Sequence, residues 1–263
     1  MVQRVSKWRP SDNCLYVIPD IHGMYNQLEL ILARILPLRK TGGHMDQLIF
    51  LGDYIDRKAS SYKVVDLVMK VKAEAPDQVI TLVGNHELMI QEVMKPNASL
   101  SEYNMWMNNG GEETLIGYLK REKSDIESPY AIPRHCISAH IPREHKMFFE
   151  SLQPYYETDD YIFVHGGCDP FIPLKIQDPK VLAWDRSIYQ HMWNLAENKI
   201  KCPWNKTIVT GHNGEPGGKP FIHDKYMMLD GSQAEKVYLW ELNSMTGFYA
   251  LKSNKRLVKE SIT

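Results

Sequence analysis

The chain alternates between short apolar runs and longer amphipathic stretches. Five apolar runs stop abruptly at a polar cluster: LYVI before PDIHG, QLIFL before GDYIDR, VITLV before GNHE, YIFV before HGG, and TIVT before GHN. Short apolar runs bounded by turn residues are typical of buried strands. The pattern therefore predicts five strands, each with polar side chains at its carboxyl end.

Helices are predicted after the first three of these strands. The leucines and isoleucines of MYNQLELILARIL recur with the i, i+3, i+4, i+7 spacing of one helix face, and the valines of SSYKVVDLVMKVKAEA do the same. Ser60 or Ser61 is the expected N-cap of the second helix, and LMIQEVM is expected to form a third helix that Pro96 terminates. Strands that alternate with helices indicate an α/β fold with a largely parallel sheet in the first half of the chain. Ligands of such sheets bind beyond the carboxyl ends of the strands, so we expect the five polar clusters on one rim.

No linker or internal repeat divides the chain. Residues 95–157 are expected to be more helical and are rich in Met, Trp and aromatic residues, which indicates a helical excursion that covers the rim. KYMMLDG, KVYLWEL and GFYAL predict short strands near the carboxyl end. We therefore expect a single domain, residues 1–263, with a helical excursion at about 95–157.

Composition narrows the class of protein. The 263 residues are 43% hydrophobic and 24% charged, with a formal net charge of -1, which gives no field that favours nucleic acid or an anionic membrane. No stretch approaches the ~20 apolar residues of a membrane span, and the first residues lack a signal-peptide core. The four cysteines, at positions 14, 136, 168 and 202, show no CxxC spacing. Scattered cysteines predict reduced thiols and a cytoplasmic protein.

The strand ends carry side chains of metal-binding and acid–base type. In chain order they are Asp20, His22, Asp53, Asp56, Arg57, Asn85, His86, Glu87, His165 and His212. Carboxylate, carboxamide and imidazole ligands without thiolate suit manganese, iron or zinc, whereas carboxylates alone would favour magnesium or calcium. The set is large enough for two ions, which in two-metal sites lie about 3.5–4 Å apart and share a bridging group.

The order of the clusters is also distinctive. PDIHG, GDYIDR, GNHE, HGG and GH resemble the phosphoprotein phosphatase family of the calcineurin-like metallophosphoesterases, above all its small bacterial and phage members. NNGGEETL at residues 108–115 and WDR at residues 184–186 extend the similarity, which covers about Leu15 to Asp230. The resemblance implies an α/β fold in which a β-sandwich of mixed sheets is flanked by helices in four α/β/β/α layers.

The resemblance implies a centre of two divalent metal ions, with manganese first and iron or zinc as alternatives. It assigns six metal ligands: Asp20 and His22 to one ion, Asn85, His165 and His212 to the other, and Asp53 as the bridge. A carboxylate suits the bridging position because it can place oxygen between two cations.

The resemblance also implies four catalytic residues. His86 would be the general acid, with Asp56 holding its imidazole protonated and oriented. Arg57 and Arg186 would grip the phosphate oxygens that are not transferred, a task for which a planar bidentate donor is suited. Glu87 is interpreted as a support for the loop geometry, with no ligand role.

These roles imply a phosphomonoesterase. The leading hypothesis is a phosphoprotein phosphatase for Ser/Thr, with Tyr as a further option, in which a hydroxide activated by two metals attacks phosphorus in line without a phosphoenzyme. The expected substrate is a phosphorylated protein or a small phosphate ester, with no nucleic-acid or membrane partner and no indication of oligomeric state. A non-enzymatic scaffold is disfavoured by the full ligand set.

Two other enzyme classes of the same fold stay open. Diadenosine tetraphosphatases resemble the chain, but they commonly lack the Asp of the Asp-Arg pair and carry GNHD, so Asp56 and Glu87 favour phosphoproteins. Nucleases and other phosphodiesterases usually end in GHxH, whereas this chain has GHNG with Gly214 at that place.

Two positions depart from the family pattern, and several histidines fall outside it. Pro19 and Lys58 stand where the family usually has glycine, which puts the backbone path of both loops in question, and Lys58 adds a charge near the expected phosphate site. We expect ordinary structural roles for the remaining histidines, at positions 44, 135, 140, 145, 191 and 223.

Overall fold

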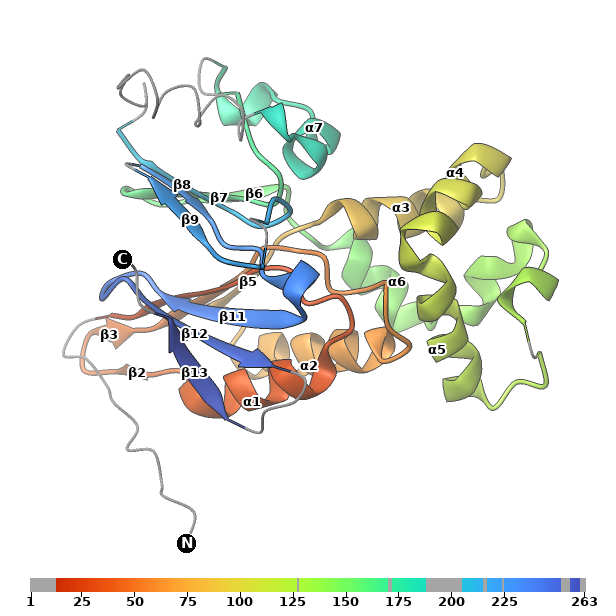
Figure 1. Ribbon diagram of the computed structural model, residues 1–263, viewed down its shortest axis with the longest axis horizontal. Helices are drawn as coiled ribbons and strands as arrows, with labels where there is room; N and C mark the ends of the chain where they lie inside the picture. Colours follow the sequence, from red (N-terminus) through yellow and green to blue (C-terminus); the bar gives the residue numbers. More distant parts are fainter. Residues whose placement is uncertain are drawn as a thin grey trace, which may run out of the picture.

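The protein consists of two β-sheets stacked face to face, with helices on both outer sides (Figure 1). The computed structural model describes residues 13–126, 128–169, 172–187, 205–214, 217–223, 225–251 and 256–260. Within these residues the predicted strands and helices are present.

The first sheet has six strands in the order β13-β12-β11-β1-β4-β5. Its strands are β1 (Leu15–Ile18), β4 (Gln47–Phe50), β5 (Val79–Thr81), β11 (Lys236–Glu241), β12 (Thr246–Leu251) and β13 (Leu257–Glu260). β1, β4 and β5 are parallel, as predicted for the first half of the chain, and β11 to β13 add an antiparallel half.

The second sheet has five strands in the order β6-β7-β8-β10-β9. They are β6 (Tyr155–Glu157), β7 (Tyr161–Val164), β8 (Thr207–Thr210), β9 (Phe221–His223) and β10 (Tyr226–Met228). The three central strands are parallel and the two outer ones antiparallel to their neighbours, so this sheet is mixed as well. A small hairpin pairs β2 (Lys40–Thr41) with β3 (His44–Met45).

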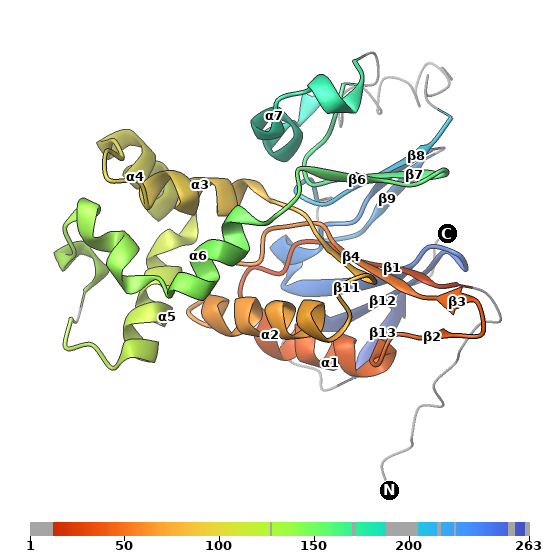
Figure 2. The ribbon, with the colours of Figure 1, turned by 180° about the vertical axis from the view of Figure 1, so that it is seen from behind.

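Helices occupy the outer faces and one flank of the sandwich. The α-helices are α1 (Tyr25–Ile35), α2 (Ser61–Glu74), α3 (Asn85–Val93), α4 (Leu100–Trp106), α5 (Glu112–Glu122), α6 (Arg143–Glu150) and α7 (Pro179–Trp184). A π-helical turn, η1 (Met107–Gly111), joins α4 to α5, and short 3₁₀ turns are η2 (Pro129–Ala131), η3 (Arg134–His140), η4 (Leu174–Ile176) and η5 (Ser232–Ala234). Figure 2 shows α3 to α6 beside the sheets, whereas α1 and α2 lie under the first sheet.

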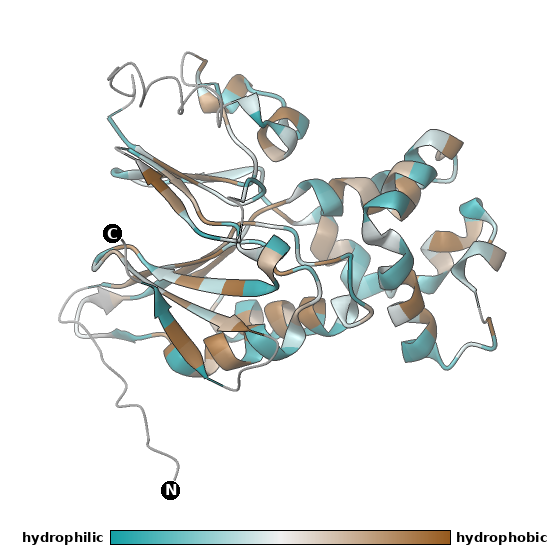
Figure 3. Ribbon diagram, in the orientation of Figure 1, coloured by the Kyte–Doolittle hydropathy of each residue, from teal (hydrophilic) through white to brown (hydrophobic). Residues whose placement is uncertain are grey.

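Alternation of side chains along the strands produces the layers. Leu48 and Phe50 of β4 face the core between the first sheet and helices α1 and α2, while Ile49, between them, faces the second sheet. On β7, Phe163 faces the space between the sheets, and its neighbours Ile162 and Val164 face a third core against α7. Three apolar cores therefore separate four layers, and the predicted α/β/β/α architecture is confirmed. Figure 3 shows the apolar residues along the strands and on α1 and α2.

Two local predictions differ in detail from the structure. Ser60 is the N-cap residue of α2, but its hydroxyl donates a 2.6 Å hydrogen bond to the Gly23 carbonyl and does not accept from the helix. The third helix begins at Asn85, earlier than the apolar pattern indicated, and ends before Pro96 as expected. The early start places the GNHE cluster on the first turn of α3.

Residues 95–157 form a largely helical flank. The helical segment, as we call residues 95–157, comprises α4, η1, α5, η2, η3 and α6, and it ends in β6, which joins the second sheet. That the whole chain is a single domain stays a prediction. Among the described residues, no helix combines the length and the apolar character needed to cross a membrane.

Candidate functional site

The loop between β4 and α2 has an unusual backbone. Asp53, Asp56 and Arg57 have φ values of 54°, 73° and 66°. Positive φ costs a non-glycine residue roughly 1–2 kcal/mol, so surrounding contacts must impose this path. Pro19 and Lys58, the departures from the family pattern, do not have positive φ, so neither position requires glycine here.

Glu87 supplies much of that constraint from the first turn of α3. Its carboxylate accepts hydrogen bonds from the backbone N–H of Asp53 at 2.8 Å, Tyr54 at 2.9 Å and Ile55 at 3.3 Å. It also accepts from the N–H of Gly84 at 3.1 Å. Burial, with the nearby Asp53 carboxylate, raises the pKa of Glu87 to about 7. Both carboxylate oxygens are thus engaged by the loop and point to no other ligand.

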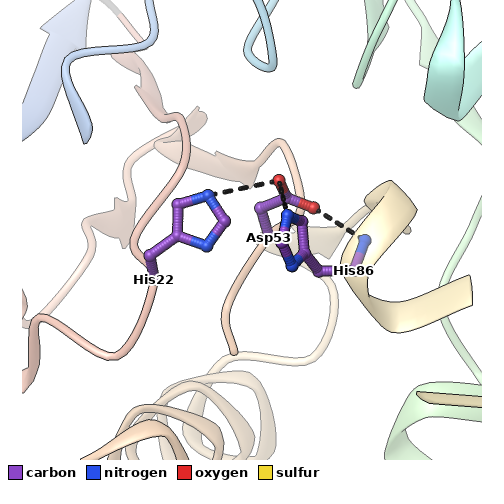
Figure 4. A group of neighbouring side chains, drawn as sticks. All are labelled: His22, Asp53 and His86. Atoms are coloured by element: carbon purple, nitrogen blue, oxygen red, sulfur yellow. Dashed lines mark hydrogen bonds and ion pairs between the residues drawn. The ribbon is translucent and has the colours of Figure 1, made fainter. Parts of the chain in front are cut away.

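The carboxylate of Asp53 lies at the centre of the strand-end side chains. Its Oδ2 is 3.4 Å from His22 Nε2 and 3.8 Å from His86 Nε2, and its Oδ1 is 3.3 Å from His165 Nε2. Figure 4 shows His22 and His86 on either side of this carboxylate. Two groups with metal-ligand spacing share it: His22, Asp53 and His86, and Asp53, His165 and His212.

Two of the buried imidazoles have an open nitrogen. His22 Nε2 and His212 Nε2 lack a hydrogen-bond partner in the described part of the chain. Burial lowers the pKa of His22 well below its usual value, and burial with the charge of His165 lowers the pKa of His212 to about 3. Both rings are therefore neutral near pH 7, with a lone pair available to a cation.

The opposite nitrogens of two rings are fixed by backbone carbonyls. His22 Nδ1 lies 2.9 Å from the carbonyl oxygen of Ile55, and His165 Nδ1 lies 2.9 Å from that of Leu51. Such contacts orient the rings of metal-binding histidines and direct the other nitrogen toward the ion.

Asp20, from the loop after β1, and Asn85, the first residue of α3, complete the cluster. Asp20 Oδ1 accepts from the His212 N–H at 2.9 Å, and its Oδ2 is 3.8 Å from His22 Nε2. Asn85 Oδ1 lies 3.1 Å from His165 Nε2. The backbone next to Asn85 packs closely against Asp53, since a Cβ added at Gly84 would be 2.1 Å from Asp53 Oδ1. All six predicted metal ligands are buried.

His86 and Asp56 form a buried pair beside this cluster. His86 Nδ1 is 2.6 Å from Asp56 Oδ2. Burial works to lower the pKa of His86, but Asp53 and Asp56 outweigh it and raise the pKa above its usual value. The other oxygen of Asp56 accepts hydrogen bonds from Thr114 Oγ1 at 2.7 Å and Trp106 Nε1 at 3.1 Å.

Two arginines stand at the edge of the cluster. Arg57 Nη2 is 3.5 Å from His86 Nε2, and Arg57 Nη1 donates to Ser232 Oγ at 3.4 Å. Arg186 Nη1 donates to Asn213 Oδ1 at 3.1 Å and to the His212 carbonyl at 3.5 Å. Neither arginine forms an ion pair with a carboxylate of the described residues.

Some residues at the site were missed by the strand-end reasoning. Trp106 and Thr114 contact Asp56 from the helical segment, and Ser232 contacts Arg57 from η5. Asp230 is buried next to them and accepts from the Ser232 N–H at 2.7 Å. Thr114 lies within the motif NNGGEETL, which could have indicated it. No local sequence feature marks Trp106 as a partner of Asp56.

Among the histidines with expected structural roles, His145 has defined partners for its ring. His145 is buried with both ring nitrogens paired, to Tyr118 Oη at 2.8 Å and Asp66 Oδ1 at 2.9 Å. Cys14, Cys136 and Cys168 form no disulfide within the described residues, and reduced thiols stay a prediction. Position 202 and position 191 lie outside the described residues.

Comparison with known proteins adds family information. The model of the calcineurin-like phosphoesterase family matches residues 15–239. A stretch of 73 residues is 37% identical to the serine/threonine-protein phosphatase PP2A-like PPG1 of Candida albicans, covering 27% of this chain and 16% of that protein. A stretch of 84 residues is 36% identical to the serine/threonine-protein phosphatase ppe1 of Schizosaccharomyces pombe, covering 31% and 25%. The matches thus span a quarter or less of these relatives' length.

Solved structures share the fold over nearly the whole chain. A crystal structure of a candidate diadenosine tetraphosphatase has a TM-score of 0.56 at 15% identity, covering 96% of this chain and 95% of that chain. A cold-active protein tyrosine phosphatase has a TM-score of 0.56 at 18% identity, covering 95% and 79%. A protein serine/threonine phosphatase from Saccharomyces cerevisiae has a TM-score of 0.52 at 20% identity, covering 95% and 79%. At these identities the likeness establishes the fold alone.

Proposed function

The chain belongs to the calcineurin-like phosphoesterase family, and on that premise we propose that it is a metal-dependent phosphomonoesterase that acts on phosphorylated proteins. The observation that carries the proposal is the position of the Asp53 carboxylate, whose Oδ2 is 3.4 Å from His22 Nε2 and whose Oδ1 is 3.3 Å from His165 Nε2, two imidazoles assigned to different ions. A shared carboxylate is what a pair of closely spaced cations requires.

The residues present fit a two-metal centre. His22 Nε2 and His212 Nε2 are buried without a partner, and an unsatisfied buried polar atom is costly unless a ligand occupies the position it faces. His22 and Asp20 would hold one ion, and Asp53 would serve both. Asn85, His165 and His212 would complete the second. The donor set of oxygen and imidazole nitrogen makes manganese the first ion to test, with iron and zinc as alternatives.

When bound, the two cations would supply Lewis acidity and lower the pKa of water at the site. The remaining steps belong to the chain itself. His86 Nε2 would protonate the leaving oxygen, and Asp56, 2.6 Å from His86 Nδ1, would hold the ring in position. Arg57 and Arg186 would bind the phosphate oxygens, a role supported by their lack of carboxylate partners among the described residues.

Two observations favour a phosphoprotein substrate. The curated relatives are named as serine/threonine-protein phosphatases. The chain also has both Asp56 and Glu87, whereas diadenosine tetraphosphatases commonly lack the first and carry aspartate in place of the second. In this structure both carboxylates have defined partners: Asp56 binds His86, and Glu87 binds the loop that contains Asp53.

A dinucleoside polyphosphate hydrolase is the second candidate. It is favoured by the candidate diadenosine tetraphosphatase, whose fold matches over 95% of its own length. The two candidates differ in their leaving group. The serine oxygen of a phosphoserine ester must be protonated as it leaves, whereas the phosphate leaving group of a polyphosphate needs no proton.

The test is an activity panel after metal removal. The protein is stripped with a chelator, reloaded separately with manganese, zinc or magnesium, and assayed on a phosphoserine peptide, a phosphotyrosine peptide, an aryl phosphate, an aryl phosphodiester and diadenosine tetraphosphate. We expect metal-dependent release of phosphate from the phosphopeptides at a higher kcat/KM than from the other substrates. A preference for diadenosine tetraphosphate or for the phosphodiester would overturn the phosphoprotein assignment.

A further inference from the structure

We infer that the helical segment (residues 95–157) takes part in the acid–base chemistry, with Thr114 and Trp106 as positioning residues for Asp56 and, through it, for His86. The inference rests on the proposed function, because it needs His86 to act on a leaving group. It assigns the helical segment a role beyond covering the rim.

The two oxygens of Asp56 have separate tasks. Oδ2 faces His86 Nδ1 at 2.6 Å, while Oδ1 accepts from Thr114 Oγ1 at 2.7 Å and from Trp106 Nε1 at 3.1 Å. Asp56, Thr114 and Trp106 are each 0% exposed, so no bulk water can replace a missing donor. The two donors fix the rotation of the carboxylate, and the orientation of Oδ2 toward the imidazole follows from it.

Thr114 also holds the backbone of Asp56. The Asp56 N–H donates to Thr114 Oγ1 at 2.8 Å, so one hydroxyl accepts from the main chain and donates to the side chain of the same residue. Asp56 has φ of 73°, a conformation that its own sequence does not favour. A threonine on α5 thereby stabilises the strained position from which Asp56 reaches His86.

The turn between α4 and α5 is shaped for this contact. The N–H of Arg57 donates to the Gly110 carbonyl at 3.0 Å, and a Cβ added at Gly110 would lie 2.6 Å from the Arg57 nitrogen. At Gly111 an added Cβ would lie 2.5 Å from the indole of Trp106. The first glycine therefore permits the approach of the loop, and the second permits the position of the ring that donates to Asp56. Gly110 has φ of 101°, so the chain kinks between α4 and α5 at the residue that contacts Arg57.

The geometry of His86 depends on these contacts. With Nδ1 held by Asp56, the ring presents Nε2 toward Asp53 Oδ2 at 3.8 Å and Arg57 Nη2 at 3.5 Å, the side where phosphate would lie. Loss of a donor on Asp56 Oδ1 would let the carboxylate rotate and would move Nε2 away from the leaving oxygen. A loss of this kind slows substrates with poor leaving groups most, because these depend on the general acid.

The experiment compares Thr114→Val, which removes the hydroxyl at nearly constant shape, with Thr114→Ser, which keeps it. With manganese-loaded protein we expect Thr114→Val to lower kcat about 10–100-fold on a phosphoserine peptide and at most about threefold on an activated aryl phosphate. Thr114→Ser should restore kcat to within about threefold of the original chain. Trp106→Phe should show the same substrate dependence with a smaller loss.

The matched control is Thr81→Val. Thr81 is also a buried threonine, 1% exposed, and its hydroxyl has no partner among the described residues. We expect this variant to keep kcat on both substrates. Metal content and melting temperature are measured for every variant, so that loss of the metal centre or of the fold is recognised directly.

A variant that lacks the His86 imidazole distinguishes a positioning role of Thr114 from a purely structural one. In His86→Asn protein, Thr114→Val should cause no further loss of kcat on the phosphoserine peptide, because no imidazole is left to position. Equal losses on both substrates, or a full additional loss in the His86→Asn background, would overturn the inference and leave the proposed function intact. If His86→Asn itself affects both substrates equally, the proposed acid role fails first, and the inference fails with it.

Discussion

Two groups of side chains around buried histidines differ in how the nitrogens of the imidazole rings are hydrogen-bonded. At the strand ends, His22 Nε2 and His212 Nε2 have no hydrogen-bond partner among the described residues. In the helical segment, both nitrogens of His145 are paired, one with Tyr118 Oη and the other with Asp66 Oδ1. The first cluster leaves two ring nitrogens without a hydrogen bond, which suits the proposed metal ligands, whereas the second pairs both nitrogens of its histidine. Burial alone therefore does not distinguish a ligand from a structural histidine. An unpaired nitrogen favours a ligand role for His22 and His212, whereas both nitrogens of His165 have partners and give no such sign.

The arginines of the two regions differ in the same way. Arg121, beside His145, binds Asp66 at 2.7 Å and lies 3.8 Å from Glu144. Arg57 and Arg186 at the strand ends form no ion pair with a carboxylate among the described residues; Arg57 contacts Ser232 and His86, and Arg186 contacts Asn213 and the His212 carbonyl. A guanidinium without an ion pair, next to the proposed metal site, is suited to an anionic substrate, while one that is ion-paired stabilises helix packing.

The change that should disrupt the strand-end cluster most is Asp53→Asn, because it removes the charge that both metal groups share. We expect loss of bound metal and a fall in kcat of about 10³-fold or more, since two cations contribute several kcal/mol to such reactions. Metal content is measured by mass spectrometry, and rate with an aryl phosphate. Asp66→Asn in the other cluster is the control and should keep both. Normal metal content and rate in Asp53→Asn would exclude the bridging role.

The next largest effect is expected from His86→Asn. The variant should keep its metal and lose roughly 10²–10⁴ in kcat on substrates with poor leaving groups. A series of aryl phosphates with leaving groups of increasing pKa measures this, and the loss should grow along the series. A constant loss across the series would show that His86 has another role, such as metal binding.

Arg186→Ala tests an arginine that forms no ion pair among the described residues. Hydrogen bonds to charged groups contribute about 1.5–3 kcal/mol, so we expect kcat/KM to fall about 10–100-fold and inhibition by inorganic phosphate to weaken. Arg121→Ala is the matched change in the His145 cluster and should leave both quantities unaltered. Unchanged kinetics and phosphate inhibition in Arg186→Ala would remove this residue from the site.

His145→Gln tests the second cluster through stability instead of rate. Removing one partner of a buried hydrogen-bonded group costs about 1–3 kcal/mol, measured by urea unfolding at pH 8, with metal content and kcat unchanged. Burial lowers the pKa of His145, although Asp66 opposes this, so the folded state binds fewer protons than the unfolded state. The stability that the neutral ring contributes is therefore present above about pH 6.5 and is lost as pH falls toward the folded pKa. The deficit of the variant should shrink at pH 5; a deficit that grows on acidification would contradict a neutral ring.

The smallest effect is expected from Lys58→Ala. Lys58 Nζ is 2.5 Å from Glu235 Oε1, and the side chains are 30% and 47% exposed. Exposed pairs of this kind contribute about 0–1 kcal/mol. Because Glu235 compensates the charge, kcat/KM should change by no more than about twofold, and Glu235→Gln serves as the reciprocal variant. A loss above tenfold in Lys58→Ala alone would place this lysine in substrate binding.

Much of the strand-end cluster could be predicted because its members are close to strands in sequence. Asp20, Asp53 and Asn85 each follow a parallel strand within a few residues, and parallel strands bring their carboxyl ends to one edge whatever the rest of the fold does. A supporting role for Glu87 was expected from the sequence, but its partners were not, because most of them are backbone N–H groups more than 30 residues away. Such contacts depend on the loop conformation and leave no mark in the residue pattern.

By itself, the sequence determined which chemical groups stand at the carboxyl ends of the strands, because strand length and polarity are local properties. Only the tertiary structure decided which atoms of those groups have hydrogen-bond partners and which do not. The Asp56 carboxylate acquires its donors from Thr114, 58 residues away, and from Trp106, 50 residues away. The physical reason is that hydrogen-bond geometry changes over fractions of an ångström, and only the packing of the helical segment against the loop fixes distances on that scale.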